Sequence, residues 1–181
     1  MVPDATFADS ETIPLGSLRL RAIHTPGHTP GHACFYHEES GVLFTGDHIL
    51  KRITPNPGLY FMENRYEKRS RSLPDFLRSM AKLQGIAARR VLGAHEGEMG
   101  DLRAAIDRLI RHHERRAGTV LRAIDHGRTT GFELLPLLFP NLRVTGLHPA
   151  LSETIGHLDL LEERGAALPA RENGLLRYRR P

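Results

Sequence analysis

The sequence has little cysteine, no tryptophan, few lysines and no long apolar run. Its one cysteine, Cys34, cannot form an internal disulfide, and the apolar residues around it indicate a small buried hydrophobe, not a catalytic thiol. Apolar runs such as residues 132–139 are too short to cross a bilayer, and residues 1–20 lack the basic-then-apolar order of a secretory signal. We therefore expect a cytoplasmic protein that does not interact with membranes.

Lysine is so rare that the formal charge of +4 comes almost wholly from arginine. Guanidinium groups suit phosphate oxygens and carboxylates, so this charge would help an acidic substrate or a nucleic acid to approach. Acidic residues are interspersed throughout, however, and an ordinary solvated surface is the simpler interpretation. A length of 181 residues with 40% hydrophobic and 25% charged residues is typical of one globular domain, or of one with a small second domain.

Three short segments place metal-ligand side chains beside glycine or proline. They read His-Thr-Pro-Gly-His-Thr-Pro-Gly-His at 24–32, Phe-Thr-Gly-Asp-His at 44–48 and Gly-Ala-His-Glu-Gly at 93–97. Proline and glycine fix tight turns, and each segment follows a short apolar run that predicts a β-strand. Strand ends in layered α/β proteins converge on one edge, where ligands bind. We expect His28, Asp47 and His95 to meet there around a metal.

The remaining pattern predicts mixed α/β structure. Short strands are expected at 12–16, 17–23, 32–37, 42–45 and 90–92, a long loop with a helical turn at 51–72, and an amphipathic helix at 73–84. From Asp101 onward the chain becomes helical, with an apolar stripe from 102 to 124, a capping box at 130–133 and a helix from Pro149 to Gly165. A hairpin follows at 166–179, turning at Asn173-Gly174. Helices followed by such a hairpin are typical of a winged-helix module.

Together, the three histidine- and aspartate-bearing segments resemble the third, fourth and fifth motifs of the metallo-β-lactamase superfamily. Within it, the chain is most similar to glyoxalase-II-like hydrolases and lactamase-like endoribonucleases, some of which carry a C-terminal winged-helix-like module resembling residues 105–181. The implied fold is the C-terminal half of an αββα sandwich at 1–104, followed by that module. The resemblance implies that His28 binds one metal, His95 a second, and Asp47 bridges both as a catalytic residue.

The resemblance also implies a cofactor and a reaction. Two zinc ions are expected in a complete site, with manganese or iron as alternatives, and a metal-activated hydroxide would attack a thioester, an ester or an RNA phosphodiester. The family's upstream His-x-His-x-Asp-His motif is absent from this sequence. We therefore expect residues 1–181 to be the C-terminal portion of a longer hydrolase, weak or inactive by itself. The sequence leaves the substrate and the metal identity open.

The other histidines have simpler interpretations. His24 and His32 share the first loop and are expected to support it instead of binding metal, while His48 could approach substrate. The run His112-His113-Glu114 cannot replace the missing motif, because consecutive helix residues point in different directions. His113 lies on the apolar stripe and is expected to be packed and hydrogen-bonded.

Two other functions stay open. The chain could be a winged-helix nucleic-acid-binding protein with a remnant metal site, in which basic residues of the hairpin contact phosphate; these are Arg171, Arg177, Arg179 and Arg180. It could also be a non-catalytic scaffold. A packing role for the C-terminal module is the preferred alternative to nucleic-acid contact, because fold alone does not give function. A second copy of the chain, forming a homodimer, is a further candidate partner.

Overall fold

The fold is described by a computed structural model that covers residues 5–62 and 65–181. Its main sheet has six strands in the order β1-β2-β3-β4-β7-β8, in which β4 and β7 are parallel and all other neighbours are antiparallel. The strands are β1 (Thr12–Leu15), β2 (Leu18–His24), β3 (Ala33–His37), β4 (Val42–Gly46), β7 (Arg90–Gly93) and β8 (Glu98–Met99). The expected strands are confirmed, and β8 adds an edge that the sequence pattern did not indicate.

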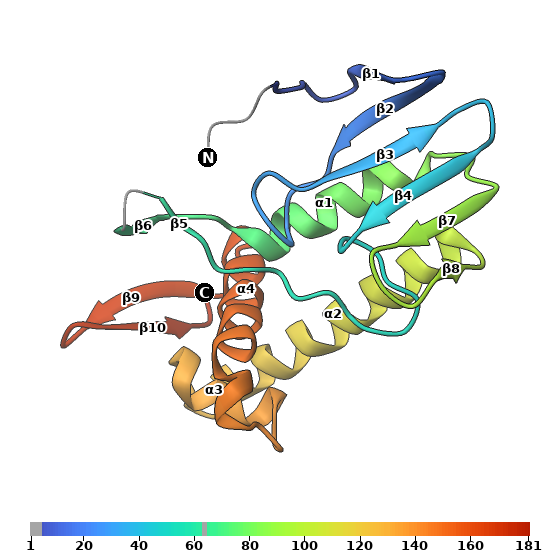
Figure 1. The fold of residues 1–181 in the computed structure, drawn as a ribbon. Helices are drawn as coiled ribbons and strands as arrows, with labels where there is room; N and C mark the ends of the chain where they lie inside the picture. The colour runs from blue at the N-terminus through green and yellow to red at the C-terminus, as the bar shows by residue number, and fades with distance from the viewer. Residues whose placement is uncertain (1–4, 63–64) are drawn as a thin grey trace.

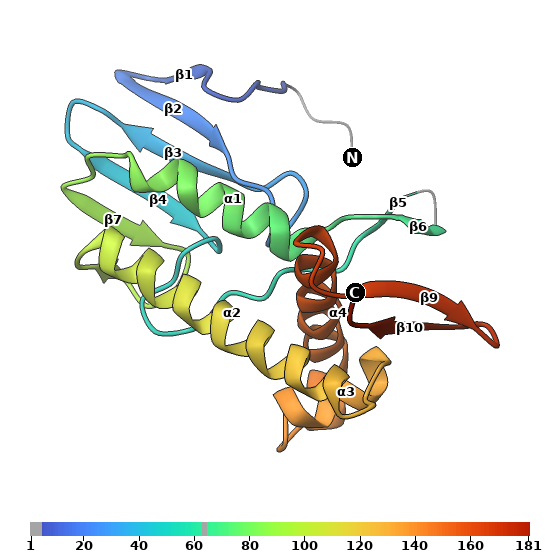
Figure 2. The ribbon, with the colours of Figure 1, turned by 180° about the vertical axis from the view of Figure 1, so that it is seen from behind.

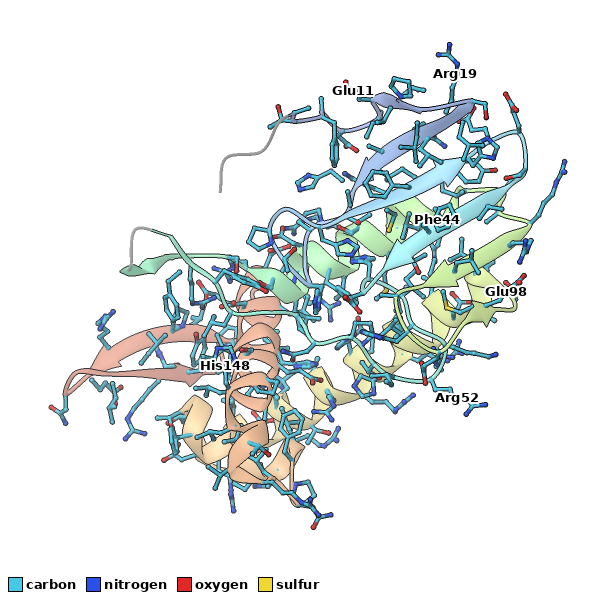
Figure 3. The ribbon with its side chains drawn as sticks, viewed as in Figure 1. Glu11, Arg19, Phe44, Arg52, Glu98 and His148 are labelled. Atoms are coloured by element: carbon cyan, nitrogen blue, oxygen red, sulfur yellow. The ribbon has the colours of Figure 1, made fainter. Side chains whose placement is uncertain are left out.

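The two faces of this sheet differ in what covers them. Tyr36, Leu43 and Val91 are aligned across neighbouring strands and buried against helices. Alternation places Phe35, Phe44 and Leu92 on the opposite face, where the side chain of Phe44 is 40% exposed (Figure 3). The helices therefore cover one face of the sheet only.

Helices α1 (Ser72–Gln84) and α2 (Leu102–Asp125) cover the buried face (Figures 1 and 2). The expected amphipathic helix at 73–84 is confirmed as α1, which has Pro74 in its first turn and buries Phe76 and Met80 completely. The carboxylate of Asp101 caps α2 by accepting hydrogen bonds from the next free backbone amides, those of Arg103 and Ala104. Helix α2 is long enough to extend beyond the sheet, where it contacts the C-terminal elements.

The C-terminal elements are three helical segments and a hairpin: α3 (Gly131–Leu138), the 3-10 turn η1 (Val144–Gly146), α4 (Leu147–Glu163), β9 (Leu168–Glu172) and β10 (Leu175–Arg179). The capping box of Thr130 and Glu133 is present. Asn173 and Gly174 both have positive φ, at 50° and 78°, as the expected hairpin turn requires. The winged-helix assignment and the domain boundary after residue 104 stay predictions. Residue 104 lies in the first turn of α2, and a single hydrophobic core extends from the main sheet to β10.

The segment between β4 and α1 differs from the expected loop. It contains a two-stranded ribbon of β5 (Phe61–Met62) and β6 (Arg65–Arg69), and its described residues form no helical turn before α1. Arg69 makes a two-pronged hydrogen bond with the buried carboxylate of Asp159 on α4. Arg71 donates to the Asp159 carbonyl over 2.8 Å, so this segment is tied to the C-terminal helices. No helix in the described part of the chain is long and apolar enough to cross a bilayer.

Candidate metal centre at the strand ends

The loop after β2 is fixed by its own backbone and by α1. Thr25 N donates to His32 O over 2.9 Å, which closes the loop, and the side chain of Ser79 on α1 donates to Pro26 O over 2.8 Å. Gly27 has a φ of 141°, and a Cβ there would lie 2.5 Å from the Cα of Phe76. Only glycine fits this contact between loop and helix. The loop therefore holds the next residue, His28, in one place.

The orientation of the His28 ring is set by the long segment after β4. Its Nδ1 lies 3.1 Å from the carbonyl oxygen of Asn56, and because a carbonyl can only accept, Nδ1 carries the proton. The lone pair of His28 is then on Nε2. Metal-binding histidines in proteins are commonly oriented in this way, by donating the other ring N–H to a carbonyl or carboxylate.

The turn after β4 places Asp47 at the same edge of the sheet. His48 N donates to Thr45 O over 3.0 Å, and the hydroxyl of the buried Thr45 donates to Ile49 O over 2.8 Å. Gly46 has a φ of 52°, and a Cβ there would lie 2.7 Å from Nε2 of His32. The glycine thus allows the first loop to approach the carboxylate-bearing turn.

Asp47 and His95 are in direct contact. Ala94 N donates to Gly46 O over 2.9 Å, which joins the turn after β7 to the turn after β4. Nε2 of His95 lies 3.2 Å from Oδ1 of Asp47, and the two side chains are 64% and 35% exposed. The parallel pairing of β4 with β7 brings both strand ends to one edge, as expected.

His28 joins this pair through His32. The rings of His28 and His32 are 6.2 Å apart, and the His32 ring lies against Gly46, next to Asp47. His28, Asp47 and His95 do not form a group whose ligand atoms all lie within 4.8 Å of one another. The structure thus brings Asp47 and His95 together, whereas the meeting of all three residues around a metal stays a prediction.

The other histidines of these loops are held by the protein itself. His24 is exposed, and its Nε2 lies 2.9 Å from Pro30 O. Nδ1 of His32 lies 2.9 Å from the hydroxyl of Thr25. Burial, followed by the neighbouring His28, lowers the pKa of His32, while Asp47 opposes the shift. Both residues support the loop, as the sequence predicts.

His48 is fully buried and faces away from solvent. Its ring lies 4.4 Å from that of Phe76 and 5.5 Å from that of His32. Burial lowers its pKa to about 3, so the ring is neutral at physiological pH. His48 therefore packs in the interior against Phe76 and His32, and its burial gives no support to the possibility that it approaches substrate.

Sequence reasoning missed two supports of the site. The backbone of Asn56 orients His28, although its position in a long irregular segment gave no signal. The carboxylate of Glu96 accepts from Arg52 N over 2.8 Å and from Ile53 N over 3.3 Å, and these bonds lower its pKa. Glu96 has a φ of 70° and thus stands at a strained turn, next to His95. It anchors the segment that leaves the site.

The donor set fits divalent transition metals. Two imidazoles and a carboxylate are ligands that zinc, manganese and iron accept, and the proton on Nδ1 leaves the Nε2 lone pair of His28 available. An α/β fold with such donors on its strand-end loops defines the class of metallo-hydrolases. The family model "Metallo-beta-lactamase superfamily" matches residues 1–122. The chain belongs to this superfamily.

Relatives and solved structures agree with the family. A probable metallo-hydrolase of Bacillus subtilis is 31% identical over 80% of this chain and 45% of its own length. The crystal structure of a metallo-beta-lactamase family protein from Thermus thermophilus is 36% identical with a TM-score of 0.81, covering 97% of this chain and 54% of that one. A beta-lactamase domain protein from Burkholderia ambifaria is 26% identical with a TM-score of 0.88, covering 100% and 54%. The chain thus spans about half the length of these proteins.

Proposed function

We propose that this chain supplies part of the catalytic centre of a metal-dependent hydrolase that acts on a thioester, an ester or an RNA phosphodiester. The observation that carries the proposal is the contact between Asp47 and His95, 3.2 Å apart at the end of two parallel strands, with His28 on a loop at the same edge of the sheet. Family membership supports hydrolysis as the reaction class. The chain spans about half the length of its relatives, so we propose both the substrate class and the activity of the complete protein.

His28, Asp47 and His95 would hold the metal. A bound divalent metal would act as a Lewis acid on the substrate's oxygen and lower the pKa of water to about 7. Asp47 provides the negative charge that offsets the metal charge, and its contact with His95 keeps both groups at one edge. Asn56 and Glu96 hold the surrounding segments, and buried His48 and Phe76 pack together behind the turn after β4.

A substrate panel tests the reaction class. Residues 1–181 within a protein that also carries the upstream His-x-His-x-Asp-His motif, loaded with zinc or manganese, would be offered an acyl thioester, an aryl ester and a phosphodiester, and released thiol, phenol or alcohol would be measured. The proposal expects hydrolysis of at least one, with Asp47→Asn lowering kcat/KM more than about 100-fold. Glu39→Gln, in the exposed turn before β4, is the control and should keep the activity. Equal rates for protein with and without metal would contradict the proposal.

A nucleic-acid-binding role has less support. Arg177 donates to the hydroxyl of Thr129 over 2.8 Å and pairs with Glu172 at 3.6 Å, and Arg180 pairs with Asp125 at 2.8 Å. Two of the arginines expected to contact phosphate are thus engaged within the chain. The alternative stays a prediction, which salt-dependent duplex binding would test.

A further inference from the structure

A second histidine cluster lies where α2 packs against α4, separated from His48 by the ring of Phe76, which is 5.8 Å from that of His113 and 4.4 Å from that of His48. His112 and His113 come from α2, and Glu153 comes from α4. One ligand atom from each of these three residues lies within 4.8 Å of the other two. Nε2 of His112 is 3.5 Å from Oε1 of Glu153. His157, one turn after Glu153, places its ring 5.4 Å from that of His113.

Five buried polar atoms of this cluster lack hydrogen-bond partners in the described part of the chain. His113 is fully buried, and neither of its ring nitrogens is hydrogen-bonded; its predicted packing is confirmed, but its predicted hydrogen bonding is wrong. Nε2 of His112, Nε2 of His157 and Oε1 of Glu153 are also buried without such a partner. Buried polar groups are rarely left unsatisfied in native proteins, so a cluster of them calls for an unseen partner.

Hydrogen-bond geometry leaves lone pairs inside the cluster. Nδ1 of His157 donates to Glu153 O over 2.8 Å, because a carbonyl can only accept, and this leaves the lone pair on its buried Nε2. Imidazole nitrogens beside a carboxylate are ligands that divalent transition metals accept.

We propose that His112, His113 and Glu153 form a second metal site, for a divalent ion of the zinc type, that joins α2 to α4. Two imidazoles and one carboxylate suit such ions, and a fourth position is left for water or for His157. Bonds of about 2.0–2.1 Å place tetrahedral ligands about 3.4 Å apart, a separation that His112 and Glu153 nearly have. A ligand atom of His113 lies within 4.8 Å of both.

The guanidinium of Arg116 is the positively charged group that a bound metal would have to displace from Glu153. Its Nε lies 3.3 Å from Oε1 of Glu153, without hydrogen-bond geometry, and its guanidinium lies 4.4 Å over the ring of Phe139. The side chains of Arg116 and His112 are 23% and 25% exposed. A bound ion would require the guanidinium to turn toward solvent, on the side where both side chains are partly exposed.

Cobalt binding tests the site in a background where the strand-end loops cannot bind. The double variant Asp47→Asn/His95→Gln would be titrated with Co²⁺, following the visible absorption of the ion and the ¹⁵N shifts of the imidazoles. The proposal expects one equivalent bound, with shifts at His112 and His113. Adding Glu153→Gln or His112→Gln should weaken binding at least tenfold, whereas Arg116→Gln should bind at least as tightly as the background.

The control is His148→Gln, an exposed histidine of α4, which should leave binding unchanged. Circular dichroism of each metal-free variant separates lost binding from lost folding; if Glu153→Gln fails to fold, the more exposed His112→Gln decides. No cobalt bound by the double variant, or equal binding after Glu153→Gln and His112→Gln, would overturn the proposal. Because the strand-end site is disabled throughout, neither outcome depends on the hydrolase proposal.

Discussion

The chain carries two histidine clusters of opposite design. At the strand ends, Asp47 and His95 are substantially exposed and stand on loops fixed by glycine, proline and backbone hydrogen bonds. Between α2 and α4, His113 and His157 are completely buried on regular helices. An exposed cluster held by loops can exchange water and substrate, whereas a buried cluster affects mainly stability. Mutations in the two clusters should therefore have separable effects.

The largest expected effect is on activity, at the strand ends. In a protein that also carries the upstream His-x-His-x-Asp-His motif, His28→Ala removes an oriented imidazole nitrogen and should lower metal-dependent hydrolysis more than about 100-fold, with little change in melting temperature. His24→Ala, in the same loop, should cost less than about tenfold, because His24 supports the loop through Pro30. Steady-state kinetics and calorimetry check both variants. An equal loss in the two would show that only loop shape matters.

Acidification should act through the buried histidines. The pKa values of His48, His113 and His157 are lowered to about 3, 3 and 4 in the folded chain, against about 6.5 when unfolded. The unfolded state therefore binds more protons below pH 6.5, and stability is complete above that pH and lost as the pH falls toward 4. Each group can contribute up to about 1.4 kcal/mol per pH unit. Urea melts in chelator between pH 7 and 4 measure this loss.

Replacing His113 by leucine should remove its share of that pH dependence. In wild-type protein the slope of stability against pH would be steep between 6.5 and 4, and in His113→Leu it would be shallower. A variant with the wild-type slope would show that His113 does not stay neutral in the folded chain. His148→Leu, exposed on α4, is the matched control and should keep the wild-type slope.

Gly27→Ala should destabilise the strand-end loop by about 2–4 kcal/mol. It combines strain at a φ of 141° with a Cβ placed 2.5 Å from Phe76. Gly31→Ala is the matched control in the same loop, since a Cβ there meets nothing within 4 Å and its φ is not positive. Chemical denaturation should separate the two variants clearly. Similar unfolding free energies would contradict the close packing of this loop on α1.

The smallest effect is expected in metal-free protein at the buried cluster. At neutral pH and in chelator, His113→Leu should be neutral or stabilise by about 1 kcal/mol, because it removes two buried nitrogens without hydrogen-bond partners. With zinc added, wild-type protein should gain stability that this variant lacks. Thermal melts in chelator and with zinc measure the change caused by the substitution and the stability gained from the metal. A strong destabilisation of His113→Leu in chelator would mean that the His113 nitrogens have hydrogen-bond partners in the metal-free chain.

The strand-end cluster could be predicted from sequence because short-range signals mark it. Glycine and proline locate its turns, and the parallel pairing of β4 with β7 follows from the helix between them. Asn173-Gly174 and the Thr130 capping box are similarly local signals. Their physical causes lie within a few residues of each motif.

The α2–α4 histidine cluster and the β5–β6 ribbon depend on contacts between segments that are distant in the sequence. His112 and His113 are adjacent in sequence, and helix geometry separates their directions, yet Glu153 of α4 reaches the space between them. The β5–β6 ribbon is fixed by Arg69 and Asp159, 90 residues apart, and its sequence has no alternation that predicts strands. Helix crossing and buried ion pairs leave no periodic trace in a single sequence.

Crystals soaked in zinc, with anomalous diffraction recorded on both sides of the zinc absorption edge, test the central claim most directly. The account predicts an anomalous peak within bonding distance, about 2.0–2.2 Å, of Asp47 and of His95 or His28. Density confined to the α2–α4 cluster, or no peak at the strand ends at saturating zinc, would contradict it.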